Sequence, residues 1–246
     1  MCEINICHLY PDLLNLYGDR GNIIALRKRC EWRGIRANII SLTLGDKFDP
    51  ESYDIVFLGG GQDYEQEIIQ QDLLINKSAE IKNAIKHNKV FLCICGGYQL
   101  LGKYYKTWDG KEIKFLGALD IWTVGSKTRM IGNTVYNCDF LKTENYDGNL
   151  VGFENHSGKT YLGPNVKPLC KVVKGFGNNG EDGFEGALYK NVFCSYSHGS
   201  LLPKNPALAD HLISMALKNK YKDFTSLSQL DDSIEIIAHN SVMERV

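Results

Sequence analysis

One stretch decides the fold of this chain: Lys89-Val90-Phe91-Leu92-Cys93-Ile94-Cys95-Gly96-Gly97-Tyr98-Gln99-Leu100-Leu101. Its apolar run of six residues, 90–95, is typical of a strand that is buried on both faces of a sheet. Two glycines interrupt the pattern, and the apolar residues that follow them return at helical spacing. The stretch therefore predicts a strand, a sharp turn and a helix, with Cys95 at the turn.

Cys95 is the candidate nucleophile. A tight turn between a strand and a helix exposes the side chain at its corner, and the start of the helix favours a thiolate there. Glycine at 96 and 97 lets the turn form and lets a substrate approach the backbone. Cys93 lies inside the apolar run, so we expect it to be a small core residue, as free cysteines often are.

Length and composition are those of one globular domain. The 246 residues are 43% hydrophobic and 23% charged, which is ordinary for a soluble protein. We expect a single domain over 1–246, in which the final ~25 residues form a tail or a peripheral helix. The net charge of −1 gives no electrostatic reason to expect binding to nucleic acid or to an anionic membrane.

The eight cysteines and the N-terminal residues indicate the compartment. No basic segment followed by a long apolar one opens the chain, and no apolar run approaches the ~20 residues that span a bilayer. We therefore expect a cytoplasmic protein, without membrane insertion, whose cysteines are reduced thiols. The pair 93 and 95 has no second close cysteine pair elsewhere, so we expect no metal site.

Strands and helices alternate over the first half of the predicted fold. Apolar runs predict strands at 3–9, 37–42, 54–58 and 90–94, and helical spacing returns between them. This order predicts βαβ units and a parallel sheet, whose sites lie at the carboxyl ends of the strands. The glycines at 59–61 end one such strand, so we expect them to lie beside Cys95.

The second half has a different character. Short β-like runs at 115–121, 130–140 and 169–173 predict antiparallel additions and hairpins. The glycine-rich segment 175–180 neither follows a clear strand nor opens a helix, so we expect a hairpin turn rather than a phosphate loop. After a last strand at 191–196, Asn205 is expected to cap a helix that has Pro206 in its first turn.

A nucleophilic thiol needs a base, and the chain has six histidines. His198 is the strongest candidate because it closes a buried-looking strand and is followed by glycine, and His156 is the alternative. Cys95 and His198, with backbone N–H donors from Gly96 and from the loop 59–61, would make an acyl-transfer site with an oxyanion hole.

These motifs resemble those of a known family. The segments 94–99 (ICGGYQ) and 196–199 (YSHG) resemble the elbow and histidine motifs of class I, triad-type glutamine amidotransferases. The loop 152–158 is similar to one in the cobyric acid synthase branch. A narrower resemblance is to the glutaminase subunits of lipid II isoglutaminyl synthases. It rests on further segments along almost the whole chain, namely 18–22, 59–62, 129–133, 175–186 and 201–206.

The resemblance implies a fold and a reaction. The fold would be flavodoxin-like α/β, with a mostly parallel central sheet flanked by helices and antiparallel strands added in the second half. Cys95 would attack the side-chain amide of L-glutamine, while N–H groups of Gly96 and of Gly60 or Gly61 hold the oxyanion. His198 would protonate the departing ammonia and then activate the water that releases glutamate.

The resemblance also implies substrate contacts and a partner. Arg129 is the candidate for holding the substrate carboxylate, although a solvated surface arginine is the alternative, and Gln99 is a second candidate. An ATP-using, Mur-ligase-like synthetase subunit would form a heterodimer with this chain. It would place the ammonia on the D-glutamate α-carboxylate of lipid II during peptidoglycan synthesis. We expect ATP and Mg on that partner and no cofactor in this chain, which shows no phosphate-binding motif.

Two departures from the family pattern concern the site. Cys93 stands where these elbows usually have glycine, and Ser200 stands where the usual triad acid lies, two residues after the histidine. A hydroxyl cannot stabilise an imidazolium as a carboxylate does. Glu154 and Asp210 are possible substitutes within the chain, and a carboxylate donated by the partner is the alternative.

Three other functions remain open from the sequence. The glutaminase can serve another acceptor, such as a cobyrinate-type substrate. The chain can be a stand-alone cysteine hydrolase of γ-glutamyl compounds. It can also be a non-catalytic scaffold, although a scaffold has no need for Cys95 and His198 together.

Overall fold

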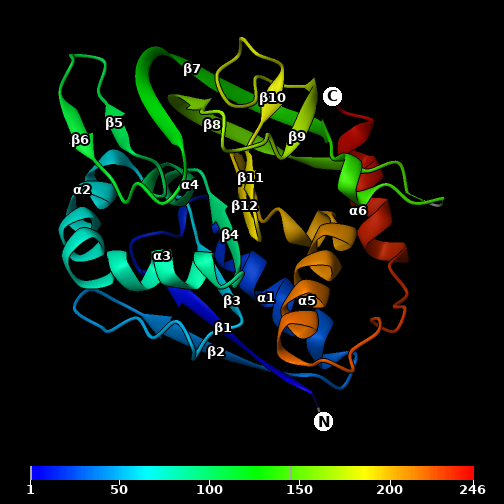
Figure 1. Cartoon of the computed structure of the whole chain (residues 1–246). Helices are drawn as coiled ribbons and strands as arrows, with labels where there is room; N and C mark the ends of the chain where they lie inside the picture. Colours follow the sequence, from blue (N-terminus) through cyan, green and yellow to red (C-terminus); the bar gives the residue numbers. More distant parts are fainter. Residues whose placement is uncertain (1, 145) are drawn as a thin grey trace.

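The first sheet of the computed structural model, which describes residues 2–144 and 146–246, has six strands in the order β11-β12-β4-β3-β1-β2. Neighbours are parallel except for β11 and β12 (Figure 1). The predicted parallel sheet is thus confirmed. The strands are β1 (Glu3–Leu9), β2 (Arg36–Leu42), β3 (Ile55–Leu58), β4 (Val90–Ile94), β11 (Ala187–Tyr189) and β12 (Val192–Ser195).

Helices cover both faces of this sheet. Figure 1 shows α1 and α5 together on one face, with α2 and α3 on the other. A π-helical turn at Leu73–Lys77 joins α2 to α3 without a break. Gly34 has φ +67 just beyond α1, a conformation that commonly ends a helix. The helices are α1 (Arg20–Glu31), α2 (Asp63–Asp72), α3 (Ser78–Lys86), α4 (Gly96–Leu100), α5 (Pro206–Lys220) and α6 (Ser233–Met243).

A second sheet, built mainly from antiparallel pairs, covers one end of the first, and its centre is the long hairpin of β7 and β8. The added antiparallel strands are therefore confirmed, and the segment after 174 is part of a hairpin between β9 and β10. The strands are β5 (Tyr104–Lys106), β6 (Glu112–Lys114), β7 (Ile121–Asn137), β8 (Asn149–Leu162), β9 (Cys170–Lys174), β10 (Phe184–Glu185) and β13 (Ser197–His198).

Two local predictions are wrong. The segment 115–120 is irregular, because its backbone N–H groups bond to carbonyls at the end of α4 and just after it, and its apolar side chains are buried there. The Asn205 side chain does not cap α5. It accepts the Val151 N–H at 2.9 Å and donates to the Val151 and Leu201 carbonyls, so it ties the start of α5 to β8.

The C-terminal helix α6 is anchored by a buried arginine. Arg29, whose side chain is 3% exposed, donates to Asp210 on α5 at 2.6 and 2.7 Å. It also donates to Asp232, just before α6, at 2.6 and 3.0 Å. Because both carboxylates share one cation, α1, α5 and α6 are held together.

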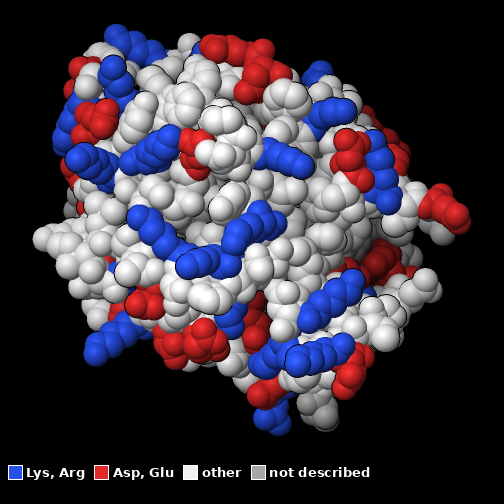
Figure 2. Space-filling model, viewed as in Figure 1, with Lys and Arg blue, Asp and Glu red and all other residues white. Residues whose placement is uncertain are grey.

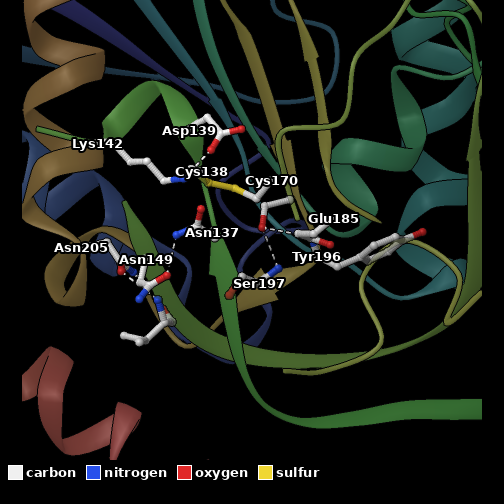
Figure 3. Close-up of a disulfide and its surroundings, with 12 residues drawn as sticks. Asn137, Cys138, Asp139, Lys142, Asn149, Cys170, Glu185, Tyr196, Ser197 and Asn205 are labelled. Carbon is white, nitrogen blue, oxygen red and sulfur yellow. Dashed lines mark hydrogen bonds and ion pairs between the residues drawn. A yellow bond between two sulfur atoms is a disulfide. The ribbon is translucent and has the colours of Figure 1, made fainter. Parts of the chain in front are cut away.

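The cysteines include one pair that the sequence did not indicate. Cys138 and Cys170 form a disulfide, which corrects the expectation that all eight are reduced (Figure 3). Antiparallel pairing of Asn137 with Lys171 brings these distant residues together. The free thiols are those of Cys2, Cys7, Cys30, Cys93, Cys95 and Cys194.

Charged side chains of both signs are interspersed over the face shown in Figure 2. Within the described ranges, no helix combines the length and the apolar character needed to cross a membrane.

Candidate active site

Cys95 lies at the corner between β4 and α4. Its φ of 48° and ψ of −102° are rare for a residue with a side chain, as expected of a strained elbow. Glycine is required next to it because the first sheet packs closely there. A Cβ on Gly97 would lie 2.7 Å from the Leu58 carbonyl oxygen, and one on Gly96 would lie 2.8 Å from the Gly61 nitrogen.

His198 reaches the same place from the neighbouring strand. The Cys95 N–H donates to the Ser195 carbonyl at 2.8 Å, so β4 and β12 end side by side. The chain then enters β13, where His198 pairs with Phe153 of β8. Burial lowers the pKa of His198, but its interactions with the neighbouring Cys95 and Asp19 side chains outweigh that effect and raise the pKa to about 10. The histidine is therefore protonated at neutral pH.

A buried glutamate fixes the bend that delivers His198. Glu185 accepts the Ser195 hydroxyl and the Tyr196 N–H, both at 2.7 Å, and Ser195 Oγ accepts the Ser197 N–H at 2.9 Å (Figure 3). Burial raises the pKa of Glu185 to about 8. The Glu185 carboxyl group thus fixes the turn between β12 and β13 through its hydrogen bonds to Ser195 and Tyr196.

The structure distinguishes the two loop glycines, Gly60 and Gly61, that are candidates for the oxyanion hole. Gly60 donates its N–H to Asp19 Oδ2 at 2.6 Å, so this donor is already used. Gly61 lies against Gly96, and its N–H has no acceptor among the described residues. Gly61 and Gly96, rather than Gly60, therefore present adjacent backbone donors beside the thiol.

A cavity of about 370 Å³ opens beside Cys95. Most of its wall comes from the loop 59–62 that follows β3, the start of α2 and the β7–β8 hairpin. Its lining residues are Leu16, Tyr17, Gly61, Gln62, Tyr64, Gln66, Cys95, Gln99, Tyr105, Arg129, Asn155, His156, Ser157 and Gly158.

Arg129 lies in this wall, at the irregular part of β7. Its Nε donates to Asn155 Oδ1, and Asn155 Nδ2 donates to the Tyr17 hydroxyl. The Tyr17 ring packs edge-on against the His198 ring, with 5.0 Å between centroids. A chain of contacts therefore joins Arg129, the candidate carboxylate-binding residue, to His198, the candidate general acid–base.

Gln99 lies in the wall, but its amide group is engaged by the protein. Its Nε2 donates to the Tyr196 hydroxyl and its Oε1 accepts from Gln66 Nε2, both at 3.0 Å. Gln66 also donates to the Gly61 carbonyl at 3.3 Å. Gln99 therefore orients Gln66, a cavity residue that no sequence motif indicated.

His156 also lines the cavity, and its ring is fixed by other groups. It stacks on Tyr196 with 3.6 Å between centroids, and its Nδ1 lies 2.8 Å from the Gly158 carbonyl. Its Nε2 lies 3.7 Å from Glu154. These contacts give His156 a place in the wall.

Neither possible substitute acid is available to the candidate catalytic histidine, His198. Glu154 accepts the Tyr136 hydroxyl at 2.9 Å and the Phe176 N–H at 2.7 Å, and Asp210 is bound by Arg29. Both carboxylates therefore bind other groups of the protein.

The carboxylate that does face it is Asp19. Its Oδ2 lies 3.5 Å from His198 Nδ1, and both side chains are fully buried. Asp19 belongs to the segment 18–22, whose sequence indicated only a family resemblance. No cluster of three or more metal-binding side chains occurs in the parts of the chain that the structure describes.

The chain is similar to known glutamine amidotransferases and to subunits of glutamine-hydrolysing synthases. The model of the CobB/CobQ-like glutamine amidotransferase domain matches residues 5–206. The lipid II isoglutaminyl synthase (glutamine-hydrolyzing) subunit GatD of Streptococcus pneumoniae is 45% identical over 231 residues, covering 94% of this chain and 86% of the relative. The GatD subunit of Staphylococcus aureus is 40% identical over 245 residues, covering 100% and 97%.

A solved structure supports the fold independently. A glutamine amidotransferase from Thermotoga maritima superposes with a TM-score of 0.57 at 16% identity, covering 98% of this chain and 94% of that one. The match along most of the sequence and the cysteine elbow lead to the same conclusion: this chain belongs to the family of CobB/CobQ-like glutamine amidotransferase domains.

Proposed function

We propose that this chain is the glutaminase subunit of a two-subunit enzyme that amidates lipid II. The observation that carries the proposal is the buried pairing of Cys95 with a protonated His198 beside a cavity, in a chain 45% identical to a glutaminase subunit of that enzyme. The cavity volume of about 370 Å³ is large enough for an amino acid.

The reaction follows from the groups that line the cavity. The Cys95 thiolate attacks the side-chain amide carbon of L-glutamine, and the N–H groups of Gly61 and Gly96 stabilise the oxyanion. His198 gives its proton to the amide nitrogen, the C–N bond breaks, and ammonia leaves a γ-glutamyl thioester. The neutral His198 then takes a proton from water, whose attack breaks the thioester and yields glutamate and the thiolate.

Arg129 is proposed to bind the α-carboxylate of the glutamine. Arg129 lines the cavity, and its Nε donates to Asn155 Oδ1. A guanidinium can bind a carboxylate through two parallel hydrogen bonds, which suits this role. Gln66, held by Gln99, supplies a further amide in the same wall.

The ammonia is proposed to pass to a Mur-ligase-like synthetase subunit in a cytoplasmic heterodimer. That subunit would bind ATP and Mg, activate the α-carboxylate of D-glutamate in the lipid II stem peptide, and form the amide. The relatives' names, which describe one subunit of a glutamine-hydrolysing synthase, support this division of labour.

The test uses two cysteine variants. Cys95→Ala should abolish glutamate production from glutamine and leave the folded state unchanged. Cys93→Ala is the matched control and should keep most activity, because that side chain is fully buried within β4. Activity that survives in Cys95→Ala and is lost in Cys93→Ala would refute the assignment of the nucleophile.

The acceptor is tested with the complex. The chain is co-purified with its synthetase and incubated with glutamine, ATP, Mg and lipid II, and mass spectrometry follows conversion of the carboxylate into the carboxamide. If the complex hydrolyses glutamine and lipid II stays unamidated, the acceptor assignment is wrong.

A further inference from the structure

Asp19 is a buried carboxylate whose side chain does not cap α1, the helix that it precedes. It stands at the N-cap position of α1, where aspartate usually accepts an N–H of the first turn, but its side chain makes no such bond. Its Oδ2 instead accepts the Gly60 N–H and faces His198 Nδ1 at 3.5 Å. Its Oδ1 has no hydrogen-bond partner among the described residues.

Three residues next to Asp19 in the chain contact the segment that follows His198. Ser200 Oγ donates to the Gly18 carbonyl at 2.6 Å, and Asn22 Oδ1 accepts the Leu202 N–H at 2.9 Å. A Cβ on Gly21 would lie 2.1 Å from Ser200 Oγ, so only glycine fits there. The segment 18–22 is therefore built against the segment 198–202.

Ser200 has a specific place in this arrangement. It stands two residues after the histidine, where triad-type relatives carry their acid, and its hydroxyl holds the loop on which Asp19 lies. The backbone of Ser200 is strained, with φ of 50°, whereas Gly18, at φ 80°, adopts a conformation that glycine tolerates. Strain of this kind persists where the surrounding structure imposes it.

We propose that Asp19 is the positioning residue that orients His198 and stabilises its protonated form, replacing the acid that Ser200 cannot supply. The inference deepens the proposed glutaminase and rests on it for the reaction that His198 performs. A carboxylate from the partner subunit is then unnecessary, because the chain contains its own.

Electrostatics supports the pairing. A buried carboxylate and a buried imidazolium each lose hydration, and their mutual attraction offsets that loss only when they are close. The Tyr17 ring covers His198 and the Asp19 side chain is fully buried, so the pair is screened little by solvent. The raised pKa of His198 agrees with this, since Asp19 is among its causes.

The same oxygen links the histidine to the oxyanion loop. Oδ2 of Asp19 holds Gly60, and the next residue, Gly61, presents its N–H beside Gly96. Loss of the carboxylate therefore disturbs the general acid–base and the loop that carries an oxyanion donor together.

The test compares Asp19→Asn with Asp12→Asn. Asp12 is an exposed carboxylate in the same loop region, so its variant makes the same change of charge without touching His198. Asp19→Asn should lower kcat for glutamine hydrolysis by at least ~100-fold with a much smaller change in KM, since a wrong or mobile imidazole costs orders of magnitude in rate. Asp12→Asn should stay within about twofold of the unmodified protein.

A second readout does not depend on glutaminase activity. The rate at which iodoacetamide alkylates Cys95 is followed against pH in the complete chain. Asp19 helps to keep His198 protonated. The pH at which loss of the His198 proton changes the alkylation rate should therefore be lower in Asp19→Asn by at least ~1 unit. The part of the pH profile that is absent from the His198→Ala variant is the part that depends on His198.

The outcomes separate the two proposals. If the unmodified complex does not hydrolyse glutamine but Asp19→Asn still shifts the alkylation profile, the proposed function fails and the role of Asp19 stands. If Asp19→Asn retains both kcat and the profile, the inference is overturned. Should Asp19→Asn fail to fold, the His198 ring is titrated by ¹⁵N NMR in the unmodified protein, and a ring that is neutral at pH 7.5 overturns the inference.

Discussion

Gly60→Ala tests how closely the active site is packed around the histidine. A Cβ on Gly60 would lie 2.5 Å from His198 Cε1 and 3.1 Å from Asp19 Oδ2. Ordinary carbon–carbon contacts begin near about 3.5 Å, so the imidazole must move by about 1 Å. Gly60 does not have a positive φ, and alanine therefore fits its backbone.

The expected cost lies in catalysis. A displacement of about 1 Å at a reacting group lowers the rate by about 100-fold, which corresponds to about 2.7 kcal/mol of activation free energy. The assay is kcat for glutamine hydrolysis by the complex, with the thermal midpoint measured in parallel. The geometry therefore predicts a large fall in kcat from a variant that remains folded.

The control is a glycine-to-alanine substitution at Gly34, where the backbone disfavours a side chain but the space for one is open. Gly34 has φ +67 and open space where a Cβ would stand. Gly34→Ala should lose about 1 kcal/mol of unfolding free energy through backbone strain and keep its kcat. A Gly60→Ala enzyme with unchanged kcat, or an equal loss of kcat in both variants, would refute the reasoning.

Two further predictions concern titratable groups. His198→Ala should lower kcat by at least ~100-fold. His156→Ala should change KM or stability, because the His156 ring is fixed by stacking in the cavity wall. An equal loss of kcat in both variants, each well folded, would contradict this prediction. Burial raises the pKa of Asp72, but hydrogen bonds from groups including Lys77 and Tyr10 outweigh it and lower that pKa to about 2. Stability from Asp72, about 2 kcal/mol, should therefore be present above pH 4 and lost as the pH falls toward 2, and acid unfolding followed by circular dichroism should lose this component in Asp72→Asn.

The cavity wall explains why some candidate residues change their role once the structure is known. Arg129 was selected because arginine suits a carboxylate, and its side chain does lie at the cavity. Gln99 was selected with the elbow, yet its amide contacts Gln66 and Tyr196. A motif can indicate that a residue is near the site, but the hydrogen bonds around it decide whether it faces the substrate.

The disulfide shows the same limit for long-range pairs. Cys138 and Cys170 are 32 residues apart, and nothing in their spacing distinguishes them from the six free thiols. They meet because β7 and β9 pair antiparallel at that point. Register between distant strands is set by packing of the whole sheet, which local periodicity does not contain.

The sequence by itself determined the parallel sheet and the elbow. Short apolar strands between helical segments leave a parallel sheet as the simple way to bury both strand faces, and glycine after Cys95 permits the sharp turn. It also identified His198, because a buried strand ending in histidine at the carboxyl edge of such a sheet comes next to the elbow.

Only the tertiary structure decided which acid faces that histidine. Local rules assign Asp19 to the cap of α1, and nothing in its neighbourhood along the chain refers to His198. The two side chains are brought together by the contact of the loop 18–22 with the segment 198–202, about 180 residues later in the sequence. A carboxylate acts through its distance and burial, and both are properties of the folded chain rather than of its residue types.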